Sequence, residues 1–323
     1  MLDQYGRRID YLRISITDRC NLHCRYCTPD TAECARQEDT LSYDEMLRIC
    51  RAAVRLGITK FKVTGGEPLV RAGCAEFISA LKAQPGTQEV TLTTNGLLLE
   101  KNLDALAAAG VDGVNVSLDT PDEARYARLT GCTAQGAGDV MRAIDACCRR
   151  GIRTKVNAVL LPETYGDAVS LASIAARLPV DVRFIELMPI GHGAGMARVS
   201  PDEVLIELRR VWADLTPTDE RRGNGPAHYY ASAALSGRIG FIDAVSHKFC
   251  AGCNRARLTG TGQLKPCLCY DTAADLRALL RGGAADDALL SAMERTIFNK
   301  PRAHCFDTGA PVTERHIMSQ IGG

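Results

Sequence analysis

The sequence predicts an α/β protein that consists of an incomplete (β/α)6 barrel followed by a C-terminal extension. Two observations lead to this fold class. Up to about residue 211, six short runs rich in Val, Ile, Leu and Thr alternate with amphipathic helical stretches, and this alternation ends after Trp212. Six successive strand–helix units imply a parallel sheet with right-handed crossovers. A complete barrel has eight such units, so we expect an open, three-quarter barrel.

The expected strands are short and apolar, as strands buried on both faces are. They span residues 11–17, 59–64, 89–94, 113–118, 153–160 and 181–187. Two helices have clear N-terminal signals. Ser42 followed by Glu45 forms a capping box, and Ser200 precedes Pro201 and Glu203 at the start of another helix.

The pattern change after Trp212 divides the chain into a barrel region, 1–212, and a C-terminal region, 213–323. In the second region we expect, in order, a linker over 216–226, a hairpin over 228–243 that turns at Ser236-Gly237, helices over 273–281 and 288–297, and a polar tail that ends in Gly322-Gly323.

Composition narrows the class of function. The 323 residues include 46% hydrophobic and 24% charged side chains, which is ordinary for a globular protein, and the formal net charge is +1. This balance creates no global field that would draw the chain to nucleic acid or to a membrane. The N-terminus is polar, and no run approaches the roughly 20 apolar residues that span a bilayer. We therefore expect a cytoplasmic protein.

Cysteine is the anomaly, with 14 residues. Disulfides are rare in the cytosol, so clustered cysteines there indicate metal or redox chemistry. Six lie in two groups: Cys20, Cys24 and Cys27, and then Cys250, Cys253 and Cys267. We expect the others to be small buried hydrophobic residues: Cys34, Cys50, Cys74, Cys132, Cys147, Cys148, Cys269 and Cys305.

The first group places three thiols within eight residues, directly after the first expected strand. Three thiolates on one loop can hold a [4Fe–4S] cluster and leave one iron free to bind another ligand. A structural zinc site is the alternative, and it needs a fourth ligand such as His23 or Cys34. Zinc motifs usually separate paired cysteines by a longer loop, so the spacing favours the open cluster.

This C-x3-C-x2-C motif resembles that of the radical S-adenosylmethionine superfamily. Four further motifs of that superfamily follow later strands, as its barrel requires. They are Gly65-Gly66-Glu67-Pro68, Thr93-Thr94-Asn95-Gly96, Ser117-Leu118-Asp119 and Glu186-Leu187-Met188. Chemistry in parallel barrels lies at the carboxyl ends of the strands, where all five motifs are expected. Glu67 is a suitable partner for the α-amino group of S-adenosylmethionine.

The second group has the spacing C-x2-C-x13-C. On spacing alone, zinc is nearly as suitable as a cluster if Cys269 or His247 completes the tetrahedron. Arg255 and Arg257 alternate directly after Cys253, on a segment expected to be extended, so both guanidinium groups should point to one side. Such a pair suits phosphate recognition, which a structural zinc site does not need.

Together these motifs resemble the GTP 3′,8-cyclase family of molybdenum cofactor biosynthesis. The resemblance runs from Gly6-Arg7 and the stretch 11–21, through the central motifs, to the stretch 247–250 and Gly322-Gly323. It implies a radical lyase in which a 5′-deoxyadenosyl radical removes the 3′ hydrogen of GTP and ribose C3′ then attacks guanine C8. It also implies that the terminal glycine pair reaches into the active-site cavity.

The resemblance implies a role for each matching position. Six cysteines hold two [4Fe–4S] clusters: Cys20, Cys24 and Cys27 for the first, and Cys250, Cys253 and Cys267 for the second. S-adenosylmethionine is contacted by Tyr26, Gly66, Ser117 and Met188. GTP is contacted by Arg13, Lys62, Thr93, Lys155, Arg183, Arg255 and Arg257, of which Lys155, Arg255 and Arg257 are the expected catalytic cations. The partners implied are GTP, S-adenosylmethionine, a flavodoxin- or ferredoxin-like electron donor and a second copy of the chain.

Two positions and two alternatives remain open at this stage. Lys62 stands where the family commonly has Arg, so its phosphate contact is that of a point charge rather than a fork. Cys269 lies beside Cys267, and spacing alone assigns the ligand role to Cys267. The alternatives are another radical enzyme with an auxiliary cluster, such as a peptide maturase, and a non-catalytic zinc or iron–sulfur protein.

Overall fold

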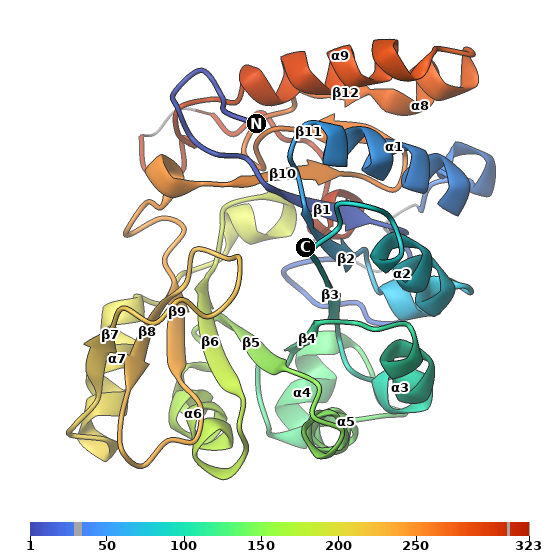
Figure 1. The fold of residues 1–323 in the computed structure, drawn as a ribbon. Coiled ribbons are helices and arrows are strands. Elements are labelled where there is room, and N and C mark those ends of the chain that lie inside the picture. The colour runs from blue at the N-terminus through green and yellow to red at the C-terminus, as the bar shows by residue number, and fades with distance from the viewer. Residues whose placement is uncertain (29–33, 309–310, 323) are drawn as a thin grey trace.

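A computed structural model describes residues 1–28, 34–308 and 311–322, and Figure 1 shows its fold. The described residues form one twelve-stranded sheet in the order β12-β11-β10-β1-β2-β3-β4-β5-β6-β9-β8-β7. Its centre is a run of six parallel strands, namely β1 (Tyr11–Ser15), β2 (Lys60–Thr64), β3 (Glu89–Thr94), β4 (Gly113–Ser117), β5 (Thr154–Leu160) and β6 (Asp181–Glu186). The sheet has two ends and is not closed, which confirms the incomplete barrel.

Helices connect these strands and cover the outer face of the curved sheet (Figure 1). They are α1 (Tyr43–Arg55), α2 (Cys74–Lys82), α3 (Leu99–Ala108), α4 (Glu123–Thr130), α5 (Ala137–Arg149), α6 (Ala168–Arg177) and α7 (Pro201–Val211). Both predicted capping boxes are present, at Ser42 and at Ser200. Short 3-10 turns lie at η1 (Gln37–Asp39), η2 (Pro68–Val70), η3 (Tyr165–Asp167), η4 (Gly191–Gly195) and η5 (Cys250–Gly252).

The C-terminal region extends the same sheet at both edges. Strand β10 (Arg255–Leu258) runs parallel to β1, and β9 (Ile239–Ile242) runs parallel to β6. The outer strands β7 (Thr216–Thr218), β8 (His228–Ala231), β11 (Gln263–Lys265) and β12 (Ala274–Asp275) are antiparallel to their neighbours. The hairpin over 228–243 is confirmed. The linker over 216–226 is wrong at its start, because 216–218 pair with β8.

Three helices complete the chain: α8 (Leu276–Arg281), α9 (Asp286–Phe298) and α10 (Met318–Ile321). Figure 1 shows α8 and α9 beside α1, and the C-terminal end of the chain close to β1 and β2. None of the helices in the described ranges is long and apolar enough to cross a membrane.

The core lies between the sheet and the outer helices. On β1, Leu12 and Ile14 are fully buried on that side, as is Val63 on β2. The intervening Arg13 and Lys62 face the inside of the barrel, where they line a cavity. The expectation of strands apolar on both faces is therefore wrong for the inner face, because the barrel interior is lined by polar and cationic side chains.

The isolated cysteines only partly match the expected burial. Cys50, Cys74, Cys147, Cys269 and Cys305 are buried, as small hydrophobic residues should be. Cys132 and Cys148 are half-buried, and Cys34 is exposed. The prediction is wrong for Cys34, which lies in the irregular segment after the first cysteine group rather than on a core-facing element.

Candidate active site

A cavity of about 280 Å³ extends from the carboxyl ends of the barrel strands, where the first cysteine group lies, to the start of β10, where the second group lies. A smaller one, of about 80 Å³, lies deeper, toward the strands' amino ends. The two share wall residues, including Arg13, Thr93 and Arg255, so they adjoin each other. Both cysteine groups line the outer cavity, whereas Lys62, Lys155 and Arg183 line the inner one.

The first cysteine group occupies the loop that follows β1, and all three thiols line the outer cavity. Burial raises the pKa of Cys20 to about 12 and raises that of Cys24, where Cys27 adds to the effect. In the described ranges no three His, Cys, Asp or Glu side chains converge closely enough to hold a single metal ion. Three thiols that line a cavity suit a [4Fe–4S] cluster, which can take three protein thiolates and leave one iron open to another ligand.

Gly65 and Gly66 allow this loop to pack on the end of β2. A Cβ on Gly66 would lie 2.4 Å from the carbonyl oxygen of Arg19, and one on Gly65 would lie 2.6 Å from that of Thr17. Instead, the Gly66 N–H donates to the Thr17 oxygen at 2.7 Å. The glycines thus hold the cysteine loop against the strand, and Gly66 remains on the cavity wall.

Glu67 lies behind that wall and is fully buried. Its carboxylate accepts hydrogen bonds from the Thr94 hydroxyl at 2.8 Å, from the Asn95 N–H at 2.7 Å and from the Leu69 N–H at 3.0 Å. Burial raises the pKa of Glu67 to about 7. The structure therefore shows Glu67 joining the ends of β2 and β3, and its contact with an amino group stays a prediction.

The other residues expected at S-adenosylmethionine lie together on the outer cavity wall. Tyr26, Ser117 and Met188 line it beside the first cysteine group. The Tyr26 hydroxyl donates to Asp119 at 2.7 Å, and the Val159 N–H donates to the other oxygen of that carboxylate at 2.7 Å. Burial raises the pKa of Asp119 to about 6. Asp119 thus orients the aromatic ring from the neighbouring wall.

The second cysteine group faces the first across the outer cavity, with two cysteines around η5 and one after β11. Burial would raise the pKa of Cys253, but the nearby charges of Lys300 and Arg255 lower it to about 7. Cys267 is half-buried, whereas Cys269 is fully buried with its Sγ 3.0 Å from that of Cys305. This arrangement favours Cys267 as the ligand.

Strand register brings the predicted cations together. Arg13 on β1 is level with Arg257 on β10 and with Lys62 on β2, so three cations lie side by side on the inner face. On the opposite wall, Lys155 and Arg183 lie on the neighbouring strands β5 and β6. Burial lowers the pKa of Lys62, and Arg183 and Arg13 lower it further. Such mutual repulsion favours a bound polyanion.

The partners of these cations are mostly neutral. Arg183 donates twice to the Asn157 side-chain oxygen, at 2.9 and 2.6 Å, and Lys155 lies 3.4 Å from Asp181. Among the described residues, Nε and Nη2 of Arg255 are buried without a hydrogen-bond partner. An unpaired buried donor is costly, so these nitrogens indicate the place of a ligand acceptor.

Sequence reasoning missed several residues of the site. Asn157 orients Arg183, and Lys300 donates from α9's C-terminal side to the Arg255 carbonyl oxygen at 2.9 Å and to that of Pro266. Asn224 lines the inner cavity from the segment expected to be a linker. No motif marks these positions, because each acts through contacts between segments far apart in the chain.

A partial barrel with three cysteines directly after its first strand defines the class of radical S-adenosylmethionine proteins. The family model for the radical SAM superfamily matches residues 14–174, and that described as Molybdenum Cofactor Synthesis C matches residues 180–306. Among solved structures, Streptococcus suis SuiB bound to S-adenosylmethionine has a TM-score of 0.65 at 16% identity, covering 97% of this chain and 78% of SuiB. That likeness concerns the fold alone.

Similarity in sequence is more specific. The chain is 38% identical over 326 residues to the GTP 3′,8-cyclase of Clostridium perfringens (strain SM101 / Type A), with 100% of both chains covered. It is 41% identical over 329 residues to the GTP 3′,8-cyclase of Paracoccus denitrificans (strain Pd 1222), with 99% of this chain and 93% of the relative covered. The chain therefore belongs to the GTP 3′,8-cyclase family.

Proposed function

We propose that this protein is a GTP 3′,8-cyclase of molybdenum cofactor biosynthesis, which joins ribose C3′ of GTP to guanine C8. The observation that carries the proposal is that a cavity lined by two cysteine groups adjoins a cavity lined by a set of cations. The thiols suit iron–sulfur chemistry in the larger cavity, and the cations suit a triphosphate in the smaller one. Family membership supports the same activity.

Two [4Fe–4S] clusters and S-adenosylmethionine are the cofactors that fit the site. Cys20, Cys24 and Cys27 would hold the first cluster, and Cys250, Cys253 and Cys267 would hold the second. When bound, the first cluster supplies the electron that releases a carbon radical from S-adenosylmethionine. Gly66, Ser117 and Met188 on the adjoining wall would position that molecule, with Tyr26 held by Asp119. Glu67 would hold together the ends of β2 and β3, which form part of this wall.

The cations would bind the substrate and orient it. Lys62, Lys155 and Arg183, which line the inner cavity, would bind the phosphates. Arg13, Thr93 and Arg255 lie where the two cavities meet, so these three residues suit groups in the middle of the nucleotide. Two nitrogens of Arg255 have no hydrogen-bond partner among the described residues and could donate to such a group. A triphosphate held at the inner end would leave the ribose and base in the outer cavity, between the cysteine groups. Fixing the nucleotide in this way brings the reacting atoms together and excludes water.

Several broader assignments belong to the same proposal. We assign residues 1–212 to the barrel and 213–323 to the C-terminal region with the second cluster and the Gly-Gly tail. The enzyme would act in the cytoplasm, as a homodimer, and take electrons from a flavodoxin- or ferredoxin-like protein. The clustered cysteines are typical of a reducing compartment and support the cytoplasm, whereas the dimer and the electron donor depend on the family resemblance.

An anaerobic assay tests the proposal. Reconstituted protein is incubated with GTP, S-adenosylmethionine and dithionite, and 5′-deoxyadenosine and cyclised nucleotide are measured. We expect about eight irons with matching sulfide, and 5′-deoxyadenosine that forms only when GTP is present. One or two zinc ions in place of iron would favour the non-catalytic alternative. Radical formation that ignores GTP would favour another substrate, such as the peptide of a maturase.

A further inference from the structure

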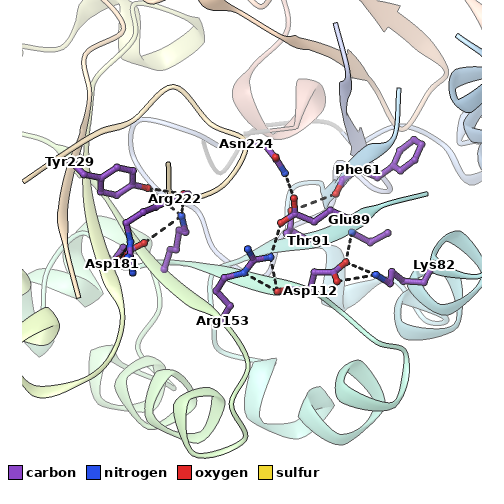
Figure 2. A network of polar contacts seen from close by, with 12 residues as sticks. Phe61, Lys82, Glu89, Thr91, Asp112, Arg153, Asp181, Arg222, Asn224 and Tyr229 are labelled. Carbon is purple, nitrogen blue, oxygen red and sulfur yellow. Dashed lines mark hydrogen bonds and ion pairs between the residues drawn. The ribbon is translucent and has the colours of Figure 1, made fainter. Parts of the chain in front are cut away.

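A loop from the C-terminal region closes the inner end of the barrel. Residues 219–227 connect β7 to β8, and 223–226 line the same inner cavity as Lys155 and Arg183. Gly113, at the start of β4, and Glu89, at the start of β3, line it as well. The loop therefore lies at the amino-terminal ends of the strands, away from the first cysteine group. Figure 2 shows two of its residues, Arg222 and Asn224, within a polar network.

The network holds the loop at two points. Arg222 Nε donates to Asp181 at 2.9 Å, and the Asn224 side chain donates to one carboxylate oxygen of Glu89 (Figure 2). Arg153 donates to the other oxygen of Glu89 at 2.7 Å. Although Glu89 lines the cavity, both of its oxygens therefore have partners, and its negative charge is paired with a guanidinium group.

The loop backbone lies against two of the predicted phosphate-binding cations. Lys155 Nζ donates to the Arg222 carbonyl oxygen and, at 3.2 Å, to the Tyr229 hydroxyl. A Cβ on Gly223 would lie 3.1 Å from Lys155 Nζ, and one on Gly225 would lie 3.9 Å from Nη1 of Arg183. Gly223 also has φ +98°, which side-chain-bearing residues rarely adopt. Glycine is thus needed at 223 for this approach.

The same loop offers unused hydrogen-bond donors. Across the described ranges, the backbone N–H groups of Gly223, Asn224 and Gly225 have no acceptor within the protein. Successive free N–H groups next to cations are an anion-binding arrangement that phosphate sites use. The carbonyl that Lys155 now contacts is neutral, so a phosphate would compete well for this ammonium.

We propose that residues 222–225 bind the terminal phosphate of the nucleotide and make the site selective for a triphosphate over a diphosphate. This inference rests on the proposed function, because it assumes that the nucleotide occupies this cavity. The terminal phosphate replaces the Arg222 carbonyl as the partner of Lys155 and accepts hydrogen bonds from the loop N–H groups. The Asn224–Glu89 contact keeps the loop in place, and a diphosphate is too short to reach it.

Nucleotide affinity of the anaerobically reconstituted enzyme tests this assignment. Dissociation constants for GTP and GDP are measured by calorimetry for wild type and for Gly223→Ala, whose methyl group would push against Lys155. We expect the variant to bind GTP about tenfold more weakly and GDP nearly as before, since one charge-assisted contact is worth roughly that factor. Asn224→Ala should also raise the ratio of the GTP dissociation constant to the GDP dissociation constant, and this substitution does not strain the backbone.

Gly283→Ala is the matched control. Gly283 also has a positive φ, +77°, but no atom of the described residues lies within 4 Å of a Cβ placed there. This variant therefore carries the backbone strain without the contact. Its affinities for both nucleotides should equal those of wild type. Equal losses for GTP and GDP in Gly223→Ala, or an unchanged ratio in both loop variants, would overturn the inference. A wild-type enzyme that binds neither nucleotide would instead overturn the proposed function.

Discussion

Arg257 Nη1 donates a hydrogen bond to the main-chain carbonyl oxygen of Gly322 at 2.5 Å and so joins β10 to the end of the chain. Gly322 has φ +76°, and a Cβ there would lie 3.0 Å from Thr64 Cγ2 and 3.2 Å from Ser15 Cβ. The tail therefore enters the barrel between the ends of β1 and β2, in a space and a backbone conformation that favour glycine.

Gly322→Ala should displace the tail and deprive the Arg257 guanidinium of its carbonyl partner. We expect cyclised product to fall at least tenfold, roughly the worth of one charged hydrogen bond, while iron content and GTP binding change little. Deleting residues 322 and 323 should have the same effect, although Gly323 lies outside the described residues. Gly110→Ala, with a similar φ of +74° and open space around it, is the control. Full cyclase activity in Gly322→Ala would show that the tail has no role.

Arg257→Ala should weaken GTP binding without loss of either cluster. Arg257 is buried in the wall of the outer cavity, level with Arg13 on the neighbouring strand. Burial lowers its pKa, so an acceptor group of the bound nucleotide would stabilise its charge. Losing such a contact costs about 1.5–3 kcal/mol, or about tenfold or more in affinity. Binding is measured by calorimetry beside Arg210→Ala, an exposed arginine paired with Glu207. An unchanged affinity would remove Arg257 from the GTP site.

The barrel could be predicted because its signals are local. The boundaries of β3 match the expected 89–94, and the boxes at Ser42 and Ser200 begin helices as expected. The edges of the sheet could not be predicted, since β9 and β10 join it by pairing with strands that are distant in the chain. Short segments such as 216–218 become strands only because a neighbour offers hydrogen bonds.

The residues of the candidate site are also of two kinds, those that a local motif marks and those that only their contacts reveal. The cysteines and Arg255 lie in dense motifs, so the sequence marks them as candidates for the site. Asn157 and Lys300 are single polar residues whose importance comes from what they contact, and a sequence does not show those contacts. Glu67 illustrates the limit: its motif marks the position, but only the structure shows that its oxygens hold Thr94 and Asn95.

GTP affinity should fall as the pH rises above about 8. Burial, followed by the charge of Arg183, lowers the pKa of Lys155 to about 8, and a bound phosphate would raise it again. The protonated form is the one that binds, so affinity is level below this pKa and decreases above it. Binding is measured between about pH 7.5 and 9.5, where the nucleotide phosphates are already ionised. Lys155→Arg should flatten the decrease. Since the pKa of Lys62 is lowered as well, we expect part of the decrease of GTP affinity with pH to remain in this variant.

Cys24→Ala should remove the first cluster and leave the second. A loop with two thiols lacks the ligand set that a four-iron cluster needs, so we expect about four irons per chain and no 5′-deoxyadenosine. Electron paramagnetic resonance of the reduced protein checks which cluster remains. Cys34→Ala is the control, because this thiol is exposed and lies outside both groups. Cleavage of S-adenosylmethionine by Cys24→Ala at the wild-type rate would contradict the assignment.

Lys300→Met should lower the reduction potential of the second cluster. The Lys300 ammonium is buried, donates to the carbonyl oxygens of Arg255 and Pro266, and acts with Arg255 to lower the pKa of the Cys253 thiol against the effect of burial. A cation beside a cluster favours its reduced form, which carries one more negative charge. Removing it should shift the midpoint downward by about 60 mV, a tenfold change for one electron.

The shift is measured by redox titration with paramagnetic resonance detection. Lys300→Arg keeps the charge and should retain most of the potential, and Lys101→Met, an exposed lysine on α3, should leave it unchanged. Iron analysis of each variant separates a shifted cluster from a lost one. If the potential of Lys300→Met equals that of wild type at full iron content, the ammonium has only a structural role, tying β10 to the segment that carries Cys267.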